Sequence, residues 1–278
     1  MKLIKGKFIA GKILAGLKKN IATKKIQPQL AVILVGENKA SKLYIRLKIQ
    51  AAQKVGIKVL LYKFKTKTEE KEIIKLIKAL NKNKKINGII VQLPLPPQYR
   101  TQKIIKAINL QKDADGFSVR SGFNNNKNFS PQPVFPYAIM KLLESAGIDL
   151  KNKKGMVICN SDIFGKTMTQ IMRQRGIITS YLLSQNLKEG IDKIKLSDVL
   201  VTAVGKPGII KGEMIKKGAI IIDGGITKQG KKVLGDVDFH SAAKKASYLS
   251  PVPGGVGPVT IACLLENVYQ LWQKQNEK

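Results

Sequence analysis

Short apolar runs alternate with amphipathic stretches along the first part of the chain. The runs are LAVILVG (30–36), KVLLYKF (58–64) and GIIVQLPL (88–95), and helical spacing of apolar residues follows each, through Lys54, near 69–82 and near 101–109. Strands that alternate with helices in this way form a parallel sheet covered on both faces. The pattern therefore predicts an α/β domain.

A second series of the same kind follows an irregular, Asn-rich segment at 120–132. A helix over 136–146 and another over 164–175 are predicted, with strands GMVICN (155–160), ITSYLL (178–183), DVLVTAV (198–204), AIIIDGG (219–225) and a late strand near SYLSPV (247–252). The segment between the two series is polar and contains prolines, which mark a boundary. We predict a two-domain α/β protein with domains at 1–122 and 133–257. The last helix, within 258–278, needs a partner for its apolar face and is expected to complete the first domain.

Composition narrows the class of protein. The chain has 278 residues and 44% hydrophobic content, enough for a sizeable core. No apolar run approaches the roughly 18 to 20 residues that a membrane-spanning helix needs, and FIAGKILAGL (8–17) is predicted to be an amphipathic helix. The two cysteines, Cys159 and Cys263, form no Cys-x-x-Cys pair, which indicates neither a disulfide framework nor structural zinc. We expect a cytoplasmic protein without membrane association.

The net charge of +32 raises the question of nucleic-acid binding. Binding proteins of that class gather Lys and Arg into a patch and carry recognisable motifs. Here the lysines are spread over nearly every predicted surface, and aromatic residues make up only 6% of the chain without an interleaved pattern. A basic nucleic-acid-binding protein is therefore a distant alternative, and no nucleic-acid partner is expected. A positive surface would still attract small anionic molecules.

Several polar residues occupy positions where ligand sites form in α/β proteins. Tyr44 and Lys48 are i,i+4 neighbours on the helix after the first strand, and Ser41 shares their face. That helix begins at the carboxyl end of a parallel strand. Gln92 ends the strand run GIIVQLPL, and Asp115 precedes a glycine in KDADGF (112–117). A solvated lysine, a glutamine bonded to backbone and a turn-forming aspartate would account equally well for these residues one at a time.

Two loops stand out by their glycine and proline content. SPVPGGVGPVT (250–260) contains three prolines and three glycines between a strand and a helix, which favours close backbone approach to a ligand at Pro253 and Gly254. VICNSDIFGKTMT (157–169) has the strand, turn and helix order that holds a dinucleotide pyrophosphate. The position where such loops usually have their first glycine is Cys159.

The chain resembles the bifunctional methylenetetrahydrofolate dehydrogenase and methenyltetrahydrofolate cyclohydrolase family over essentially its whole length. The segments that carry the resemblance are, in order, LAVILVGENKASKLYIRLK, GIIVQLPLP, KDADGF, AVGKPG, IIIDGGI, GDVDF and SPVPGGVGPVTIACLLEN. The resemblance implies a first domain that holds folate, a Rossmann-like second domain that holds NADP or NAD, a cleft between them and a homodimer. It also implies a role in one-carbon metabolism.

Residue roles follow from the resemblance position by position. Lys48 matches the catalytic lysine and Tyr44 the tyrosine that packs against folate. Gln92 matches the glutamine paired with that lysine, Asp115 the carboxylate that binds the pterin ring, and Pro253 and Gly254 belong to the substrate loop. The reaction that the resemblance implies fits these residue types. Hydride removal leaves a methenyl cation, and a lysine whose pKa falls on desolvation can deprotonate the water that opens the ring.

The dinucleotide loop departs from the family pattern Gly-Arg-Ser, because the chain has Cys159, Asn160 and Ser161 there. The residues left to hold a dinucleotide are Cys159, Asn160, Ser161, Gly165, Ser184 and Ile226. Asparagine can hydrogen-bond a ribose hydroxyl but cannot pair with a 2′-phosphate as arginine does. Two hypotheses stay open, a bifunctional enzyme with altered cofactor preference and a cyclohydrolase without dehydrogenase activity. The lone histidine, His240, has no second ligand near it in sequence, so no catalytic metal is predicted.

Overall fold

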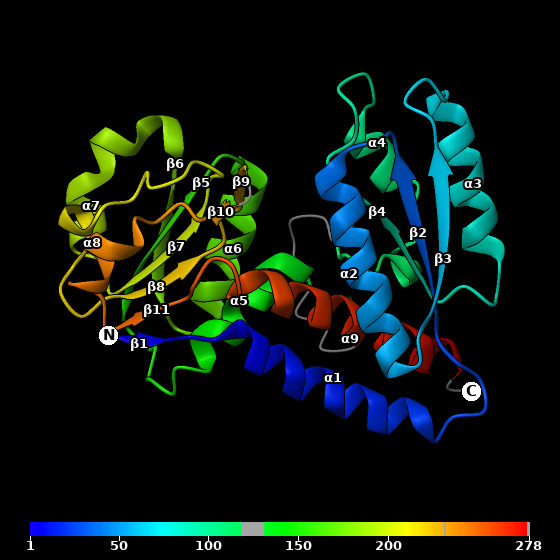
Figure 1. Ribbon diagram of the computed structural model, residues 1–278, viewed down its shortest axis with the longest axis horizontal. Coiled ribbons are helices and arrows are strands. Elements are labelled where there is room, and N and C mark those ends of the chain that lie inside the picture. The colour runs from blue at the N-terminus through cyan, green and yellow to red at the C-terminus, as the bar shows by residue number, and fades with distance from the viewer. Residues whose placement is uncertain (118–130, 231, 277–278) are drawn as a thin grey trace. The chain divides into compact units, whose positions relative to one another are not determined.

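A computed structural model describes residues 1–117, 131–230 and 232–276 (Figure 1). The chain divides into two compact units, each with its own parallel sheet. The three-stranded unit comprises Gly11–Val134 and Ile261–Lys278, and the six-stranded unit comprises Met1–Ala10 and Phe135–Thr260. The predicted α/β class is confirmed in both units, because parallel strands alternate with helices in each.

The three-stranded unit has the strand order β3-β2-β4, with every pair parallel. Its strands are β2 (Gln29–Val35), β3 (Lys58–Phe64) and β4 (Gly88–Val91). Its helical elements are most of α1 (Gly6–Ala22), α2 (Lys39–Val55), α3 (Glu70–Lys82), α4 (Thr101–Lys106), η1 (Leu110–Lys112) and most of α9 (Val256–Asn276). The predicted strand ended at Leu95, but β4 ends four residues earlier, at Val91. The prolines that begin at Pro94 cannot donate hydrogen bonds to the sheet.

The central strand β2 is buried on both faces, as expected for a parallel strand between helices. On one face, Ala31, Ile33 and Val35 share a core cluster with Ile73, Ile77 and Leu80 of α3. On the other face, Leu30 and Val268 of α9 both lie within about 3.4 Å of the point where a side chain at Gly88 would begin. The last helix therefore completes the core of this unit with its apolar side.

The six-stranded unit has the strand order β1-β11-β8-β7-β5-β6, and all its strand pairs are parallel. The strands are β1 (Lys2–Leu3), β5 (Lys154–Cys159), β6 (Ile178–Leu183), β7 (Val199–Ala203), β8 (Ile220–Asp223) and β11 (Tyr248–Leu249). An antiparallel hairpin, β9 (Thr227–Gln229) and β10 (Lys232–Leu234), follows β8. The helical elements are α5 (Val134–Glu144), α6 (Asp162–Gln174), η2 (Ser184–Gly190), α7 (Ile191–Lys195), η3 (Gly212–Met214) and α8 (Phe239–Ala243).

The strand order reverses at β5, which pairs with β6 on one side and with β7 on the other. In open α/β sheets, ligands bind beyond the carboxyl ends of the strands at such a point. The register places Cys159 opposite both Leu183 and Ala203, so the three strands end level with one another. Asn160, Ser184 and Val204 each come directly after one of these ends.

The first ten residues pair with the later part of the chain. β1 forms the edge strand next to β11, and the backbone N–H of Ile4 donates to the carbonyl of Leu249 at 3.0 Å. The domain division expected from the sequence had assigned residues 1–122 to the first domain, and its end at 122 lies outside the described residues. The unit division falls after Ala10 within α1, after Val134 at the start of α5, and after Thr260 within α9.

Helix starts differ from the predicted ones where a cap or loop extends the first turn. α6 begins at Asp162 rather than 164, because the Ser161 hydroxyl accepts a hydrogen bond from the N–H of Phe164 at 3.3 Å. Among the described helices, none combines the length and apolar character that crossing a membrane requires.

Candidate functional site

Lys48 is buried on the inner face of α2. Asn38 caps this helix by accepting the N–H of Ser41 at 2.9 Å, and the buried face then runs through Ser41, Ile45, Lys48, Ala52 and Val55. Only 7% of Lys48 is exposed, and its Nζ donates to Oε1 of Gln92 at 3.0 Å. Burial lowers the pKa of Lys48, while the negative charge of Asp115 opposes that shift. The amine is therefore poised to exist in its neutral form more readily than a surface lysine.

Gln92 lies immediately after β4, and hydrogen bonds hold both its backbone and its side chain. Its backbone N–H donates to the carbonyl of Ile33 at 2.9 Å, which continues the sheet pairing. Its side-chain Nε2 donates to the carbonyl of Leu93 at 2.7 Å. With the amide nitrogen held by backbone, the amide oxygen faces the amine of Lys48. Gln92 thus fixes the lysine without adding charge.

Asp115 is carried by a segment that runs beside β4. Residues Ile89 and Asp113 form a parallel bridge, and the N–H of Ala114 donates to the carbonyl of Ile89 at 3.2 Å. Burial raises the pKa of Asp115 to about 6, Lys48 opposes the rise and Asp113 adds to it. The structure therefore brings Lys48, Gln92 and Asp115 together at the carboxyl end of one sheet.

Asn267 of α9 holds the Asp115 segment in place, and the sequence analysis did not single it out. It is 1% exposed, and its Nδ2 donates to the carbonyls of Ala114 at 2.9 Å and Gln132 at 2.8 Å. The signal available in the sequence was a polar residue inside the apolar run IACLLENVY. A buried amide of this kind must find partners, but the sequence does not show which.

Tyr44 and Ser41 lie on the same helix face as Lys48. Tyr44 is half-buried, and its burial raises the pKa of the phenol. Ser41 is 3% exposed, and its hydroxyl has no hydrogen-bond partner among the described residues. Tyr44 lies one helical turn before Lys48 on α2.

The turn after β5 is built differently from a glycine-rich dinucleotide loop. Cys159 is 1% exposed, and its Sγ contacts the carbonyl of Ser161 at 3.3 Å. Burial raises the pKa of this thiol, so it stays protonated and unreactive near neutral pH. Gly165 lies in the first turn of α6 against Tyr181, where an added Cβ would be 2.4 Å from the ring. This glycine lets α6 pack close to β6.

Asn160 links the ends of three strands. Its Nδ2 donates to the carbonyl of Val204 at 2.5 Å, and the Ser184 hydroxyl donates to its Oδ1. Cys159, Asn160, Ser161, Gly165 and Ser184 are therefore brought together around the carboxyl ends of β5 and β6. These residues fit a dinucleotide, because the exposed side chains of Asn160 and Ser161 lie at the N-terminus of α6, where the first backbone N–H groups of the helix can bind a pyrophosphate.

The other predicted residues of the six-stranded unit lie in later loops. Ile226 follows β8 and is 44% exposed. Pro253 is exposed, and Gly254 has a φ of 106°, a backbone conformation that favours glycine. The Gly254 carbonyl accepts a hydrogen bond from the N–H of Lys7 at 3.2 Å. The structure thus places Pro253 and Gly254 in the six-stranded unit, whereas Lys48, Gln92 and Asp115 belong to the three-stranded unit.

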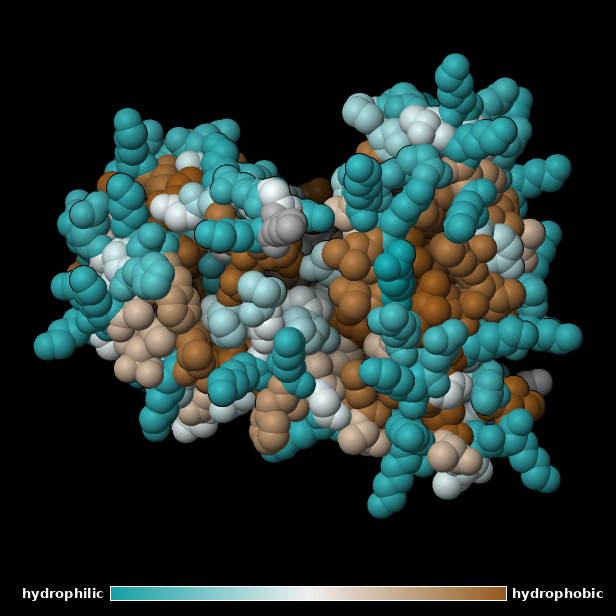
Figure 2. Space-filling model, viewed as in Figure 1, coloured by the Kyte–Doolittle hydropathy of each residue, from teal (hydrophilic) through white to brown (hydrophobic). Residues whose placement is uncertain are grey.

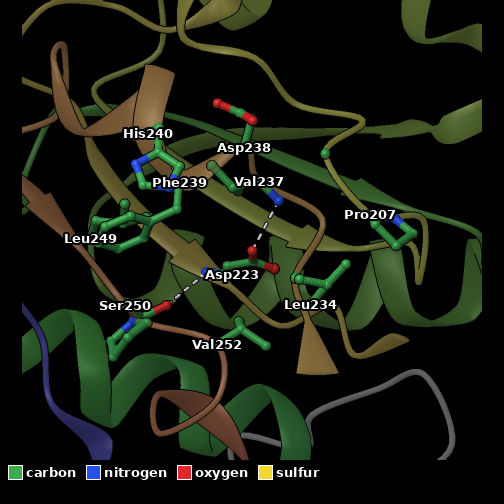
Figure 3. Close-up of a pocket in the computed structure, with 13 residues that line it drawn as sticks. Pro207, Asp223, Leu234, Val237, Asp238, Phe239, His240, Leu249, Ser250 and Val252 are labelled. Carbon is green, nitrogen blue, oxygen red and sulfur yellow. Dashed lines mark hydrogen bonds between the residues drawn. The ribbon is translucent and has the colours of Figure 1, made fainter. Parts of the chain in front are cut away.

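A cavity of about 540 Å³ lies in the six-stranded unit beyond the ends of β8 and β11 (Figure 3). Its wall includes Asp223, Phe239 and Ser250, and none of the predicted site residues lines it. His240, at the rim, is exposed. Within the described ranges, no group of three His, Cys, Asp or Glu side chains is arranged to hold a metal ion.

Comparison with known proteins gives consistent matches over the whole chain. The family model for the tetrahydrofolate dehydrogenase/cyclohydrolase catalytic domain matches residues 4–115, and the model for the NAD(P)-binding domain of the same family matches residues 133–276. The bifunctional protein FolD of Moorella thermoacetica is 44% identical over 275 residues, covering 96% of this chain and 97% of that protein. The bifunctional protein FolD of Geotalea daltonii is 42% identical over 278 residues, covering 97% and 98%.

Solved structures agree. The methylenetetrahydrofolate dehydrogenase-cyclohydrolase of Trypanosoma brucei, solved with NADP and an inhibitor, superimposes with a TM-score of 0.93 at 31% identity and covers 99% of this chain and 98% of that one. The bifunctional FolD enzyme of Campylobacter jejuni gives a TM-score of 0.91 at 35% identity, with 99% of both chains covered. With both family models matched in order and relatives above 40% identity along its length, the chain belongs to the tetrahydrofolate dehydrogenase/cyclohydrolase family.

Proposed function

We propose that this protein oxidises methylenetetrahydrofolate to methenyltetrahydrofolate with NADP or NAD, and then hydrolyses the methenyl compound to formyltetrahydrofolate. The observation that carries the proposal is the buried contact between Lys48 Nζ and Gln92 Oε1, with Asp115 as the nearby charge. A desolvated lysine next to a neutral amide and a carboxylate is suited to proton transfer in a folate site. We assign the three-stranded unit to folate and the six-stranded unit to the dinucleotide.

The hydrolytic half-reaction needs a base that does not trap a cation. Water adds to the electrophilic methenyl carbon, and its proton passes to the neutral amine of Lys48. One carbon–nitrogen bond of the ring then breaks as the added hydroxyl gives up its proton and becomes the formyl carbonyl. The departing nitrogen takes up a proton, the formyl group stays on the other nitrogen, and the proton held by Lys48 is released to solvent. A carboxylate in the position of Lys48 would hold the cation by charge attraction, whereas a lysine with a lowered pKa does not. Gln92 holds the amine of Lys48 in the same orientation in its neutral and its protonated form.

Asp115 has a different task. With its pKa at about 6, its carboxylate is mostly ionised at neutral pH and can accept hydrogen bonds from the donor edge of a pterin ring. Tyr44 supplies an aromatic surface for that ring. Fixing the ring in this way orients the methylene carbon for hydride transfer.

A bound nicotinamide dinucleotide supplies the hydride acceptor. Asn160, Ser161, Gly165, Ser184 and Ile226 are the residues that we assign to holding it, at the point where the strand order of the six-stranded unit reverses. Asn160 and Ser184 present neutral hydrogen-bonding groups, which suit ribose hydroxyls. Pro253 and Gly254 are assigned to the substrate loop.

The test is a time course with purified protein and methylenetetrahydrofolate, with each dinucleotide added separately, following reduced cofactor and formyl product. Lys48→Met should slow the hydrolysis of supplied methenyltetrahydrofolate by about 10²- to 10⁴-fold, the usual contribution of a general base. Lys54→Met, on the exposed side of the same helix, is the matched control and should retain activity. Unchanged hydrolysis in Lys48→Met would reject the assignment of the base. No affinity for either dinucleotide, with hydrolysis intact, would leave a cyclohydrolase only.

We also propose a homodimer formed through β6. This strand is the last of the six-stranded sheet, and Ile178 at its start is 63% exposed. An apolar side chain on an unpaired sheet edge favours pairing with a second copy. Light scattering should give twice the mass of the 30.6 kDa chain. Ile178→Lys should shift the equilibrium toward monomer, and a monomeric wild type would overturn this proposal.

The basic surface does not point to nucleic acid. Hydrophilic side chains are distributed over the viewed faces of both units rather than gathered into one patch (Figure 2). We propose a cytoplasmic enzyme without a nucleic-acid partner, in keeping with two free, buried cysteines. Tight, strongly salt-dependent binding to duplex or single-stranded DNA, with no saturable folate binding, would contradict this.

A further inference from the structure

Two aspartates in the motifs IIIDGGI and GDVDF are buried and are not used by the assigned chemistry. Asp236 is 0% exposed and Asp223 is 3% exposed. Asp223 ends β8, and Asp236 follows the β9–β10 hairpin. A buried carboxylate is costly unless it is fully hydrogen-bonded, so the partners of these two groups indicate what they are for.

Asp236 binds the backbone of the turn after β7. Its carboxylate accepts the N–H of Val204 at 2.6 Å, of Gly205 at 2.7 Å and of Lys206 at 2.9 Å. Three successive N–H groups converge on one anion only when the chain adopts a concave turn, and Gly205 provides it with a φ of 78°. The anion therefore selects the conformation of residues 204–206.

Asp223 in turn holds Asp236. Its carboxylate accepts the N–H groups of Asp236 at 3.1 Å and Val237 at 2.9 Å. It also accepts the Thr202 hydroxyl of β7 at 3.1 Å and the N–H of Gly225 at 2.9 Å. Figure 3 shows Asp223 bonded to the backbone of Val237 on one side and to Ser250 on the other. The carboxylate of Asp223 therefore holds the backbone at Asp236, and the carboxylate of Asp236 holds the turn after β7.

Two glycines leave the space that the carboxylates fill. A Cβ at Gly225 would lie 2.1 Å from the carboxyl carbon of Asp236, and a Cβ at Gly235 would lie 2.0 Å from Oδ2 of Asp223. Neither contact is tolerable, so any side chain at these positions would displace the carboxylate. This packing explains one glycine of each motif, Gly225 of IIIDGGI and Gly235 of GDVDF.

The turn held by Asp236 is connected to the assigned dinucleotide residues. The Val204 carbonyl accepts the Asn160 side chain, whose Oδ1 accepts the Ser184 hydroxyl. The Gly205 carbonyl accepts the Thr227 hydroxyl at 2.9 Å. Displacing the turn would therefore move Asn160, which occupies the crevice where the strand order reverses.

We propose that Asp236 is a positioning residue for the dinucleotide, holding the turn at 204–206, and through it Asn160, in the arrangement that receives the cofactor. This rests on the dehydrogenase activity proposed above. Asp236 itself acts through the backbone of the turn and through Asn160. Loss of its charge is expected to weaken dinucleotide binding more than it slows hydride transfer.

The first experiment compares Asp236→Asn with the wild type by the dinucleotide Kd from fluorescence, the dehydrogenase KM and kcat, and hydrolysis of supplied methenyltetrahydrofolate. The amide keeps the size of the side chain but loses the charge and one acceptor. We expect the Kd and KM for the dinucleotide to rise about ten-fold or more, the cost of one charge-assisted hydrogen bond. Hydrolysis should stay within about two-fold, because Lys48, Gln92 and Asp115 lie in the other unit.

The second variant, Gly205→Ala, perturbs the turn without touching the carboxylate. Apart from the chain neighbours of Gly205, no atom of the described residues lies within 4 Å of the added Cβ, so the penalty comes from the positive φ. Gly218→Ala is the matched control, because Gly218 has a φ of 86° and the same free space around an added Cβ. It lies just before the start of β8, away from the carboxyl ends of the strands. Gly205→Ala should weaken dinucleotide binding and Gly218→Ala should not. This pair keeps the test decisive if Asp236→Asn fails to fold.

The outcomes separate the two proposals. Unchanged dinucleotide Kd in Gly205→Ala, or in a folded Asp236→Asn that is merely less stable, overturns the positioning role and leaves the enzyme assignment intact. A wild type that binds neither dinucleotide refutes the dehydrogenase and the positioning role together. Equal weakening in Gly205→Ala and Gly218→Ala would show general destabilisation and also overturns the inference.

Discussion

Replacing Asn267 by leucine tests whether α9 holds the Asp115 segment. The substitution keeps a similar volume and removes both donors of the buried amide. The carbonyls of Ala114 and Gln132 then lose the partner that lies 2.9 Å and 2.8 Å away. Ala114 precedes Asp115 directly, so a shift of this backbone moves the carboxylate assigned to the pterin.

The expected cost can be worked from burial. An acceptor left unsatisfied in the interior costs about 1–3 kcal/mol. The contact with Ala114 is buried and counts fully, while the contact with Gln132 is partly buried and counts for less. The Oδ1 of Asn267 has no hydrogen-bond partner among the described residues, so removing this buried oxygen offsets part of the lost stability. We expect a net destabilisation of about 2 kcal/mol.

The assay is urea unfolding followed by tryptophan fluorescence. The single tryptophan, Trp272, lies on α9 and is 7% exposed, so its signal reports on the three-stranded unit. With a slope of about 2 kcal/mol per molar urea, the midpoint should fall by about 1 M. The folate KM should rise as well, by about ten-fold, because a misplaced orienting group is costly.

Asn276→Leu provides the control on the same helix. Its Nδ2 donates to the carbonyl of Trp272, four positions back on the same helix, at 2.7 Å, so the loss of this local bond should shift the midpoint little. If the free energy of unfolding of Asn267→Leu lies within about 0.5 kcal/mol of the wild type and its folate KM is unchanged, Asn267 does not hold the Asp115 segment.

Three further predictions concern the assigned sites. Gly165→Ala should lower stability by about 1–3 kcal/mol, since its Cβ would meet the Tyr181 ring at 2.4 Å; an unchanged melting temperature would contradict this packing. Asp115 is ionised above its pKa of about 6 and protonated below it, so the folate KM should rise as pH falls through about 6. In Asp115→Asn the KM should be high and flat across that range, and a wild-type profile in this variant would exclude Asp115 as the titrating group. Asn160→Arg should shift the ratio of NADP to NAD affinities toward NADP by about ten-fold, because guanidinium pairs with a 2′-phosphate; direct binding measurements that show no change in the ratio would remove Asn160 from the ribose site.

The alternation of apolar runs and amphipathic stretches was enough to predict the α/β class and most elements. β6 lies at 178–183 as predicted, α2 ends one residue after the predicted Lys54, and α3 begins one residue after the predicted 69. The ends of elements were less predictable, because they depend on individual side chains. Ser161 extends α6 by capping it, and the proline after Leu93 shortens β4.

The candidate site was predictable where neighbours in sequence are neighbours in space. Tyr44 and Lys48 share a helix face because of their spacing alone. Gln92 and Asp115 were singled out by their positions, and the resemblance to a family supplied their roles. Their proximity to Lys48 comes from segments that end at the same edge of the sheet.

The amino-acid sequence by itself determined the local elements, the two-part α/β organisation and the family, since each depends on periodicity or on contiguous motifs. Tertiary structure decided which distant groups meet. Asn267 bonds a carbonyl 153 positions away, Asp236 holds a turn about 30 positions away, and the first strand pairs with β11 near the end of the chain. The physical reason is that a buried polar group must be satisfied, but many partners would satisfy it. Only the packing of helices and strands in three dimensions selects the one that does.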